Sequence, residues 1–163
     1  MRIDQIISET VDSPYRYEMG MDNAMFYDTE GNSYYVRFDD FGNGIWAVAF
    51  QSGIQPVDTM TGRHDSFRVL ATVVDIVKRW ISSAKPAVLT FGASRSTPSR
   101  VKAYHRLATR LTKETPYVYI SNSSQIEDPK LRNNLSYMTV GLNAEKNKLY
   151  LIARKDLVNI EPK

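Results

Sequence analysis

Apolar and polar residues alternate along much of the first fifty positions, with the period of two that is typical of half-buried β-strands. This pattern predicts a short strand at residues 15–19 and a hairpin over residues 24–38. The hairpin is expected to turn at Glu30-Gly31-Asn32, because glycine and asparagine tolerate positive φ angles. Residues 45–50 are apolar on both faces, as a central strand is. The first third of the chain therefore predicts mostly antiparallel strands.

From position 66 onward, the apolar positions take the longer period of a helix. This helix is predicted to begin near Asp65 or Ser66, since either residue is a suitable N-cap. Its apolar positions cover a wide arc, so we expect the helix to lie largely buried against the sheet; they are Phe67, Leu70, Val73, Val74, Ile76, Val77, Trp80 and Ile81.

The remainder of the chain predicts one more helix among several strands. Residues 87–91 are expected to form a strand, and a helix then runs to about Lys113, capped by Thr97 with Pro98 in its first turn. A loop is predicted over residues 122–134, and strands are predicted over 116–121, 137–142 and 148–153, the last two forming a terminal hairpin.

The resulting element order, β-β-β-α-β-α-β-β-β, indicates the fold class. It predicts an α/β (α+β) protein with a mixed, mostly antiparallel central sheet and two main helices packed on it. The chain contains no internal repeat, low-complexity tract or linker, so residues 1–163 are expected to form a single domain.

Composition excludes several classes of function. Cysteine is absent, which rules out a disulfide framework and a thiol nucleophile. Residues 1–10 hold too short an apolar run for a secretory signal, and no stretch approaches the roughly 20 apolar residues of a membrane span. These features predict a soluble, cytoplasmic protein.

Charge is distributed unevenly along the chain. Residues 1–60 carry three basic and ten acidic side chains, a net charge of −7, whereas the remainder carries +10. Such asymmetry indicates either an anion-binding face or two oppositely charged halves. Those halves attract each other within one molecule or between copies, so a homo-oligomer built from an acidic N-terminal half and a basic C-terminal half is also expected.

The second helix carries a basic stripe. At about 100° per residue, one side of it gathers Lys102, Arg106, Arg110 and Lys113. The opposite side, with Val101, Tyr104, Ala108 and Leu111, is expected to face the core. Arg95 and Arg100 extend the positive charge to the helix start, where the helix dipole already favours an anion. The stripe predicts docking of an acidic protein surface, a phosphate group or a nucleic acid, although a solvated helix face has the same pattern. No aromatic residue interrupts it, so base stacking is not supported.

A second candidate site precedes the first helix. Gly62 permits close backbone approach, and Arg63, His64 and Ser66 lie where an anion meets a helix N-terminus. An ordinary capped helix start explains the same residues. The two histidines lack partners at metal-ligand spacing, so no metal site is expected.

The element order and residues 87–113 together resemble the GCN5-related N-acetyltransferase fold. Ser99–Leu107 is similar to the helical part of that family's late strand–helix motif. Tyr104 stands where the family often places a tyrosine that protonates the thiolate of coenzyme A. The resemblance implies acetyl-CoA as cofactor, and it extends to compact phage-encoded proteins with degenerate versions of this fold.

The chain departs from the family in the loop that holds the cofactor pyrophosphate. The family uses several glycines there, whereas residues 55–66 contain one, Gly62, so side chains obstruct the phosphate cradle. The sequence therefore predicts a non-catalytic, acetyltransferase-like protein without a cofactor, which docks its partner through the basic helix. The alternative is an acetyl-CoA-dependent N-acyltransferase in which Tyr104 is the general acid and Gly62, Arg63, His64 and Ser66 bind pyrophosphate.

Overall fold

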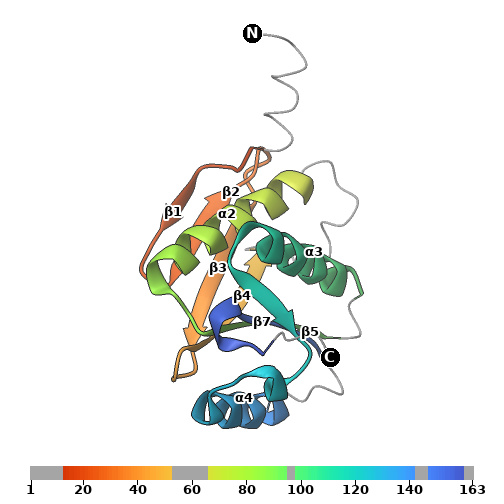
Figure 1. The fold of residues 1–163 in the computed structure, drawn as a ribbon. Coiled ribbons are helices and arrows are strands. Elements are labelled where there is room, and N and C mark those ends of the chain that lie inside the picture. The colour runs from red at the N-terminus through yellow and green to blue at the C-terminus, as the bar shows by residue number, and fades with distance from the viewer. Residues whose placement is uncertain (1–12, 53–65, 95–97, 142–146, 160–163) are drawn as a thin grey trace.

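The computed structural model describes residues 13–52, 66–94, 98–141 and 147–159 (Figure 1). Their strands form one seven-stranded sheet in the spatial order β1-β2-β3-β4-β5-β7-β6. The strands are β1 (Tyr17–Met19), β2 (Asn23–Tyr27), β3 (Ser33–Asp40), β4 (Ile45–Ser52), β5 (Val88–Ser94), β6 (Tyr117–Ile120) and β7 (Asn147–Arg154).

Every strand pair is antiparallel except β4 and β5. Their parallel register runs from Ile45–Val88 to Val48–Phe91. A parallel pair cannot be joined by a hairpin and needs a long crossover, which here contains helix α2 (Ser66–Ala84). The expected fold class, a mixed and mostly antiparallel sheet with packed helices, is confirmed.

Helices α2 and α3 (Pro98–Glu114) lie over the same face of the sheet (Figure 1). Trp80 of α2 stacks on Phe38 of β3 with ring centroids 4.1 Å apart, and Leu107 of α3 is fully buried. Fully burying an aromatic or aliphatic side chain contributes about 1.5–3 kcal/mol. This larger of two apolar clusters includes residues of all seven strands and anchors both helices to the sheet.

A third helix, α4 (Pro129–Gly141), covers the opposite face near β5, β6 and β7. The predictions of a strand at 137–142 and a loop at 122–134 are therefore wrong, because most of both segments belongs to α4 and a 3₁₀ turn, η2 (Ser123–Gln125). Leu131, Leu135 and Met138 follow helical spacing and pack into the second apolar cluster. The side chain of Asp128 accepts the backbone N–H of Lys130 and caps the helix start.

Membrane insertion through a helix finds no support in the described part of the chain. None of the helices there has both the length and the apolar character that a span requires.

The β2–β3 turn is held by one buried carboxylate. Asp28 is 8% exposed, and it accepts backbone N–H groups from Glu30 and Asn32, both at 2.9 Å. It also accepts the Asn32 side-chain amide at 2.9 Å and the Tyr34 hydroxyl at 2.8 Å. Gly31 adopts a φ of 84°, so the expected glycine turn is confirmed.

Hydrogen bonding sets the ionisation of Asp28. Burial alone would raise its pKa, but the bonds from Asn32, Tyr34 and Glu30 lower the pKa below its ordinary value of 3.8. A carboxyl whose pKa is lowered by folding stabilises the protein above its unfolded pKa. That contribution is lost as the pH falls through the lower folded pKa.

We expect Asp28→Asn to reduce the free energy of unfolding at pH 7 by about 2 kcal/mol, because hydrogen bonds to a charged acceptor are lost. The variant should also lose less stability than the wild type between pH 5 and about pH 2, since it has no carboxyl to protonate there. Urea unfolding followed by circular dichroism across this pH range measures both effects. Equal stability of the two proteins at pH 7 would contradict this assignment.

Candidate binding groove between two helices

The two faces of α3 are divided as the sequence predicts. Tyr104, Leu107, Ala108 and Leu111 are buried against the sheet. The opposite side carries the basic stripe, in which Lys102, Arg106 and Lys113 are exposed and Arg110 is half-buried. The stripe therefore lies on the surface of the molecule, and its role in binding stays a prediction.

Glu114 ties the C-terminal part of the stripe to α2. Its carboxylate accepts one hydrogen bond from the Nε of Arg110 and one from the Nζ of Lys78, each with an N–O distance of 3.2 Å. Partial burial alone would raise the pKa of Glu114, but the hydrogen bonds and charges of Lys78 and Arg110 lower it. Arg110 is thus partly neutralised, whereas Arg106 has no acidic partner among the described residues.

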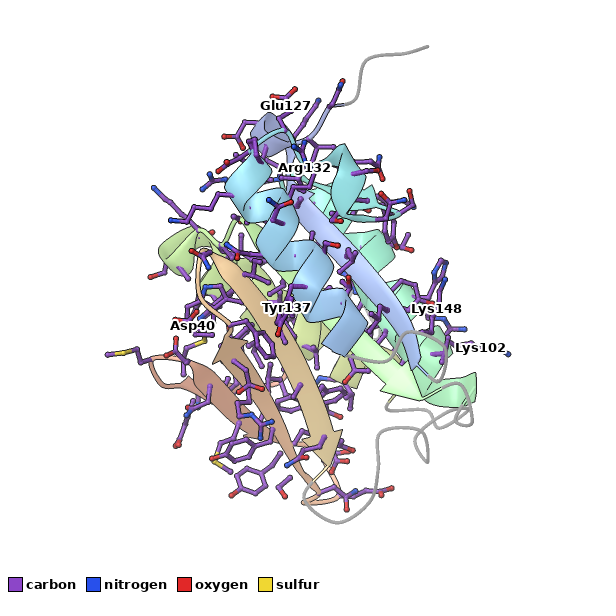
Figure 2. All side chains as sticks on the ribbon, turned by 90° about the horizontal axis from the view of Figure 1, so that it is seen from below. Asp40, Lys102, Glu127, Arg132, Tyr137 and Lys148 are labelled. Carbon is purple, nitrogen blue, oxygen red and sulfur yellow. The ribbon has the colours of Figure 1, made fainter. Side chains whose placement is uncertain are left out.

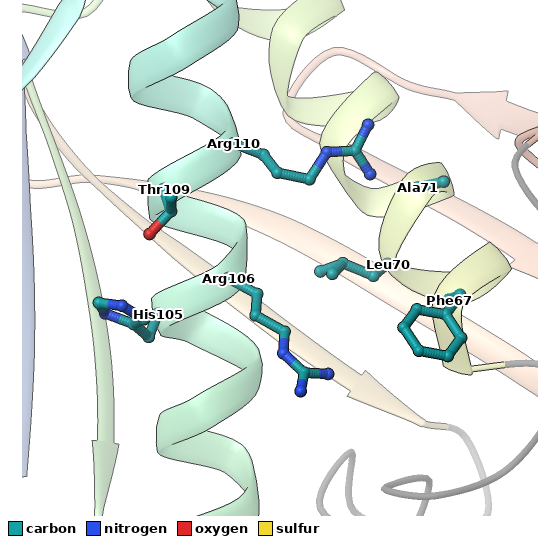
Figure 3. A pocket seen from close by; sticks show the side chains of 7 residues that line it. All are labelled: Phe67, Leu70, Ala71, His105, Arg106, Thr109 and Arg110. Atoms are coloured by element: carbon teal, nitrogen blue, oxygen red, sulfur yellow. The ribbon is translucent and has the colours of Figure 1, made fainter.

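A groove of about 440 Å³ opens between the two helices (Figure 3). Figure 3 shows Phe67 and Leu70 of α2 on one side, facing Arg106 and Arg110 of α3 on the other. The remaining lining residues are Ala71, His105 and Thr109. Arg110 lines one end of this groove. The ion pairs of Glu114 with Lys78 and Arg110 lie beyond that end.

Phe67 differs from its predicted position. It shares the spacing of the buried face of α2, yet it is 60% exposed. Phe67 is in the first turn of α2, ahead of the first buried residue of that helix, Val69, so its ring reaches the groove instead of the core. Sequence periodicity missed this groove because it arises from two helices that meet only in the folded chain.

The groove combines two kinds of chemistry at close quarters. The α2 wall offers aromatic and aliphatic carbon, and the α3 wall offers two guanidinium groups. Guanidinium groups bind carboxylates and phosphates through paired hydrogen bonds. The arrangement suits a ligand that carries an apolar group next to an anion.

The second candidate site falls largely outside the described residues. Gly62, Arg63, His64 and Arg95 lie beyond the described ranges. Ser66 and Arg100 belong to α2 and α3, but their side chains are outside the described set. Their proposed roles in anion or pyrophosphate binding stay predictions.

Tyr104 lies at the point where the two parallel strands stop pairing. The pairing of β4 and β5 ends at Val48–Phe91, although both strands continue. Two residues further along β4, the backbone N–H of Phe50 donates to the Tyr104 hydroxyl at 3.3 Å. The Tyr104 side chain is 5% exposed, and its ring centroid lies 6.1 Å from that of Phe91. The hydroxyl thus supplies a backbone partner that β5 no longer provides.

A metal centre has no support in the described ranges, where no three histidine, cysteine, aspartate or glutamate side chains gather around a common point. His105 instead lies beside Tyr150, with ring centroids 5.6 Å apart.

Comparison with solved structures finds a distant likeness. No protein-family model matches the chain, and no curated protein matches it. A solved structure similar to it is a mutant of the spermidine N-acetyltransferase SpeG from Vibrio cholerae. The match has 6% sequence identity and a TM-score of 0.40, and it covers 91% of this chain and 70% of the other. A likeness at this level carries no inference about activity.

We expect Tyr104→Phe to lower the free energy of unfolding by about 1–2 kcal/mol, because it leaves the Phe50 N–H without its partner in the protein interior. Chemical denaturation measures the loss. Tyr137→Phe is the matched control, since Tyr137 is 86% exposed and its change should alter stability by less than about 0.5 kcal/mol. Equal stability of both variants would show that the Tyr104 hydroxyl has no structural role.

Proposed function

We propose that this protein is a non-catalytic binding protein that docks an acidic partner segment in the groove between α2 and α3. The observation that carries the proposal is the placement of Phe67 and Leu70 opposite Arg106 and Arg110 around one cavity. The partner segment places an apolar side chain against α2 and its carboxylates against α3. Complementary charge then orients the segment along the helix.

The energies of the two kinds of contact indicate what each wall of the groove contributes to binding. Burying one large apolar side chain contributes about 1.5–3 kcal/mol, whereas each exposed ion pair contributes about 0–1 kcal/mol. The apolar anchor therefore supplies most of the affinity, and Arg106 and Arg110 supply specificity. These gains together reach at most about 5 kcal/mol, which corresponds to a dissociation constant no lower than about 0.2 mM. A partner that extends further along the stripe, toward Lys102 or Lys113, would bind more tightly.

Nucleic acid is the less favoured partner. A phosphate backbone would engage Lys102, Arg106 and Lys113 but would leave the apolar wall of the groove uncovered. Its affinity would fall steeply and linearly with the logarithm of salt concentration. An acidic peptide anchored by an aromatic ring would retain part of its affinity at high salt, since the apolar contact is not screened.

Binding can be tested with a labelled acidic hexapeptide that contains one phenylalanine. We expect the double change Arg106→Glu and Arg110→Glu to weaken its binding at least tenfold, measured by fluorescence polarisation at about 50 mM salt. The control, Lys130→Glu with Lys155→Glu, makes the same change in net charge at exposed positions outside the groove lining. Unchanged binding by the groove variant, or equal losses in both variants, would remove the proposal. Stronger binding of single-stranded DNA than of peptide would favour the nucleic acid.

A second candidate function is the acetyl-CoA-dependent N-acyltransferase. It is favoured by one observation, the end of β4–β5 pairing beside Tyr104, the residue that the family resemblance marks as a general acid. The groups that would meet an acetyl thioester there are the Phe50 N–H and the Tyr104 hydroxyl, and these bond to each other. The thioester therefore does not fit between them unless Tyr104 moves, and no catalytic step is derived.

We expect no change in melting temperature on adding millimolar acetyl-CoA, because the described residues offer it no preformed site. A cofactor at 100 times its dissociation constant would stabilise the fold by about 2.7 kcal/mol, roughly 5–10 °C for a chain of this size. Differential scanning fluorimetry distinguishes the two outcomes. Sodium phosphate at equal ionic strength is the control for unspecific anion binding. A rise specific to acetyl-CoA would favour the acyltransferase.

A further inference from the structure

Two turns at one end of the sheet bring acidic and apolar side chains together. The β1–β2 turn and the β3–β4 turn lie side by side, because the Phe38 N–H donates to the Asp22 carbonyl at 2.9 Å. The two turns expose the apolar side chains of Met21 and Phe41, at 89% and 47%, and β3 ends beside them with the carboxylates of Asp39 and Asp40. We call this surface the acidic tip, and its members are Met21, Asp39, Asp40 and Phe41.

The β3–β4 turn presents Phe41 in a fixed conformation. Asp40 accepts the Gly42 N–H at 2.7 Å, and the N–H of Phe41 donates to the Ile45 carbonyl at 2.9 Å. Gly42, Asn43 and Gly44 all take positive φ angles, of 85°, 59° and 82°. A contact made by a preformed turn loses little conformational entropy on binding.

The acidic tip and the groove lie at opposite ends of α2. The tip adjoins the C-terminal end of the helix, since the Ala87 N–H donates to the Gly44 carbonyl at 2.8 Å. Phe67 lies in the first turn of α2, and the helix from there to Ala84 spans about 26 Å at a rise of about 1.5 Å per residue. Figure 2 likewise shows Asp40 on the side of the molecule away from Lys102 and Lys148. No copy can therefore fill its own groove with its own tip.

Among the described residues, Asp40 of the tip and Arg106 of the groove have no ion-pair partner, whereas Asp39 is paired with Arg37 and Arg110 with Glu114. The four ion pairs between described residues each join groups from the same half of the chain, such as Arg37 with Asp39 or Arg110 with Glu114. In the described part, no ion pair links the acidic half to the basic half. The acidic half and the basic half therefore do not neutralise each other through direct ion pairs between described residues of one copy.

We propose that the groove of one copy receives the acidic tip of a second copy. The inference rests on the proposed function, and it names this chain as its own partner. Phe41 packs against Phe67 and Leu70, while Asp40 faces Arg106, the charged group of each surface that has no ion-pair partner among the described residues. Because the two surfaces differ, the contact is heterologous, and successive copies join head to tail into a ring or an open chain.

Sedimentation velocity over a range of concentrations tests this inference. We expect wild-type protein to exceed the 18.6 kDa monomer mass increasingly with concentration, and to return to it at high salt. Phe41→Ala, which disables the tip, and Arg106→Glu, which disables the groove, should each be monomeric alone. An equimolar mixture of the two variants should form a dimer, since one contributes an intact tip and the other an intact groove.

Each outcome has a distinct meaning. Wild-type protein that stays monomeric at all concentrations, or a variant mixture that forms no dimer, overturns self-docking. Lys130→Glu, a charge change outside both surfaces, should self-associate as wild type does, and circular dichroism confirms that every variant is folded. If self-association is absent but the acidic hexapeptide still binds, the proposed function stands and only the identity of the partner is wrong. If the hexapeptide also fails to bind, both the self-docking inference and the proposed function are wrong.

Discussion

The parallel contact between β4 and β5 is the constraint on which the remaining architecture depends. Two neighbouring strands that run in the same direction require a crossover, and α2 is the helix of that crossover. To bury its wide apolar arc, α2 must lie across the sheet, where Trp80 stacks on Phe38. The next helix, α3, then packs beside α2 on the same face. The groove between them is therefore a consequence of how β4 and β5 are joined.

The same contact explains the position of Tyr104. Once β4 and β5 stop pairing after Val48 and Phe91, the N–H of Phe50 needs another partner, since an unpaired buried donor is costly. Tyr104 reaches it from α3 and so couples the helix to the central strand. The Tyr104 hydroxyl is the acceptor in this bond, so the interaction accounts for the position of the side chain without assigning it a chemical role.

Local periodicity was sufficient to predict much of this fold. The turn at Gly31 and the inward face of α3, including Tyr104, were predicted because each depends on residues close in sequence. Helix α4 was missed because residues 137–142 alternate like a strand, while its stabilising contacts come from β5, β6 and β7. Phe67 was misplaced because helical phase identifies a face but not where the sheet beneath it ends. The groove and the Tyr104–Phe50 bond, which spans 54 residues, depend on tertiary packing that no local pattern records.

The acidic and basic residues that are separated along the sequence also lie at separate places on the folded chain. Asp39 and Asp40 lie at a tip at one end of the sheet, and Arg106 and Arg110 of α3 line a groove about one helix length away. Each surface also includes exposed aromatic carbon, from Phe41 at the tip and Phe67 in the groove. If copies dock as proposed, any acidic partner anchored by an apolar side chain competes with the tip of another copy. Self-docking would thereby set a threshold affinity for foreign partners, and that threshold would rise with protein concentration because occupancy by a second copy follows mass action.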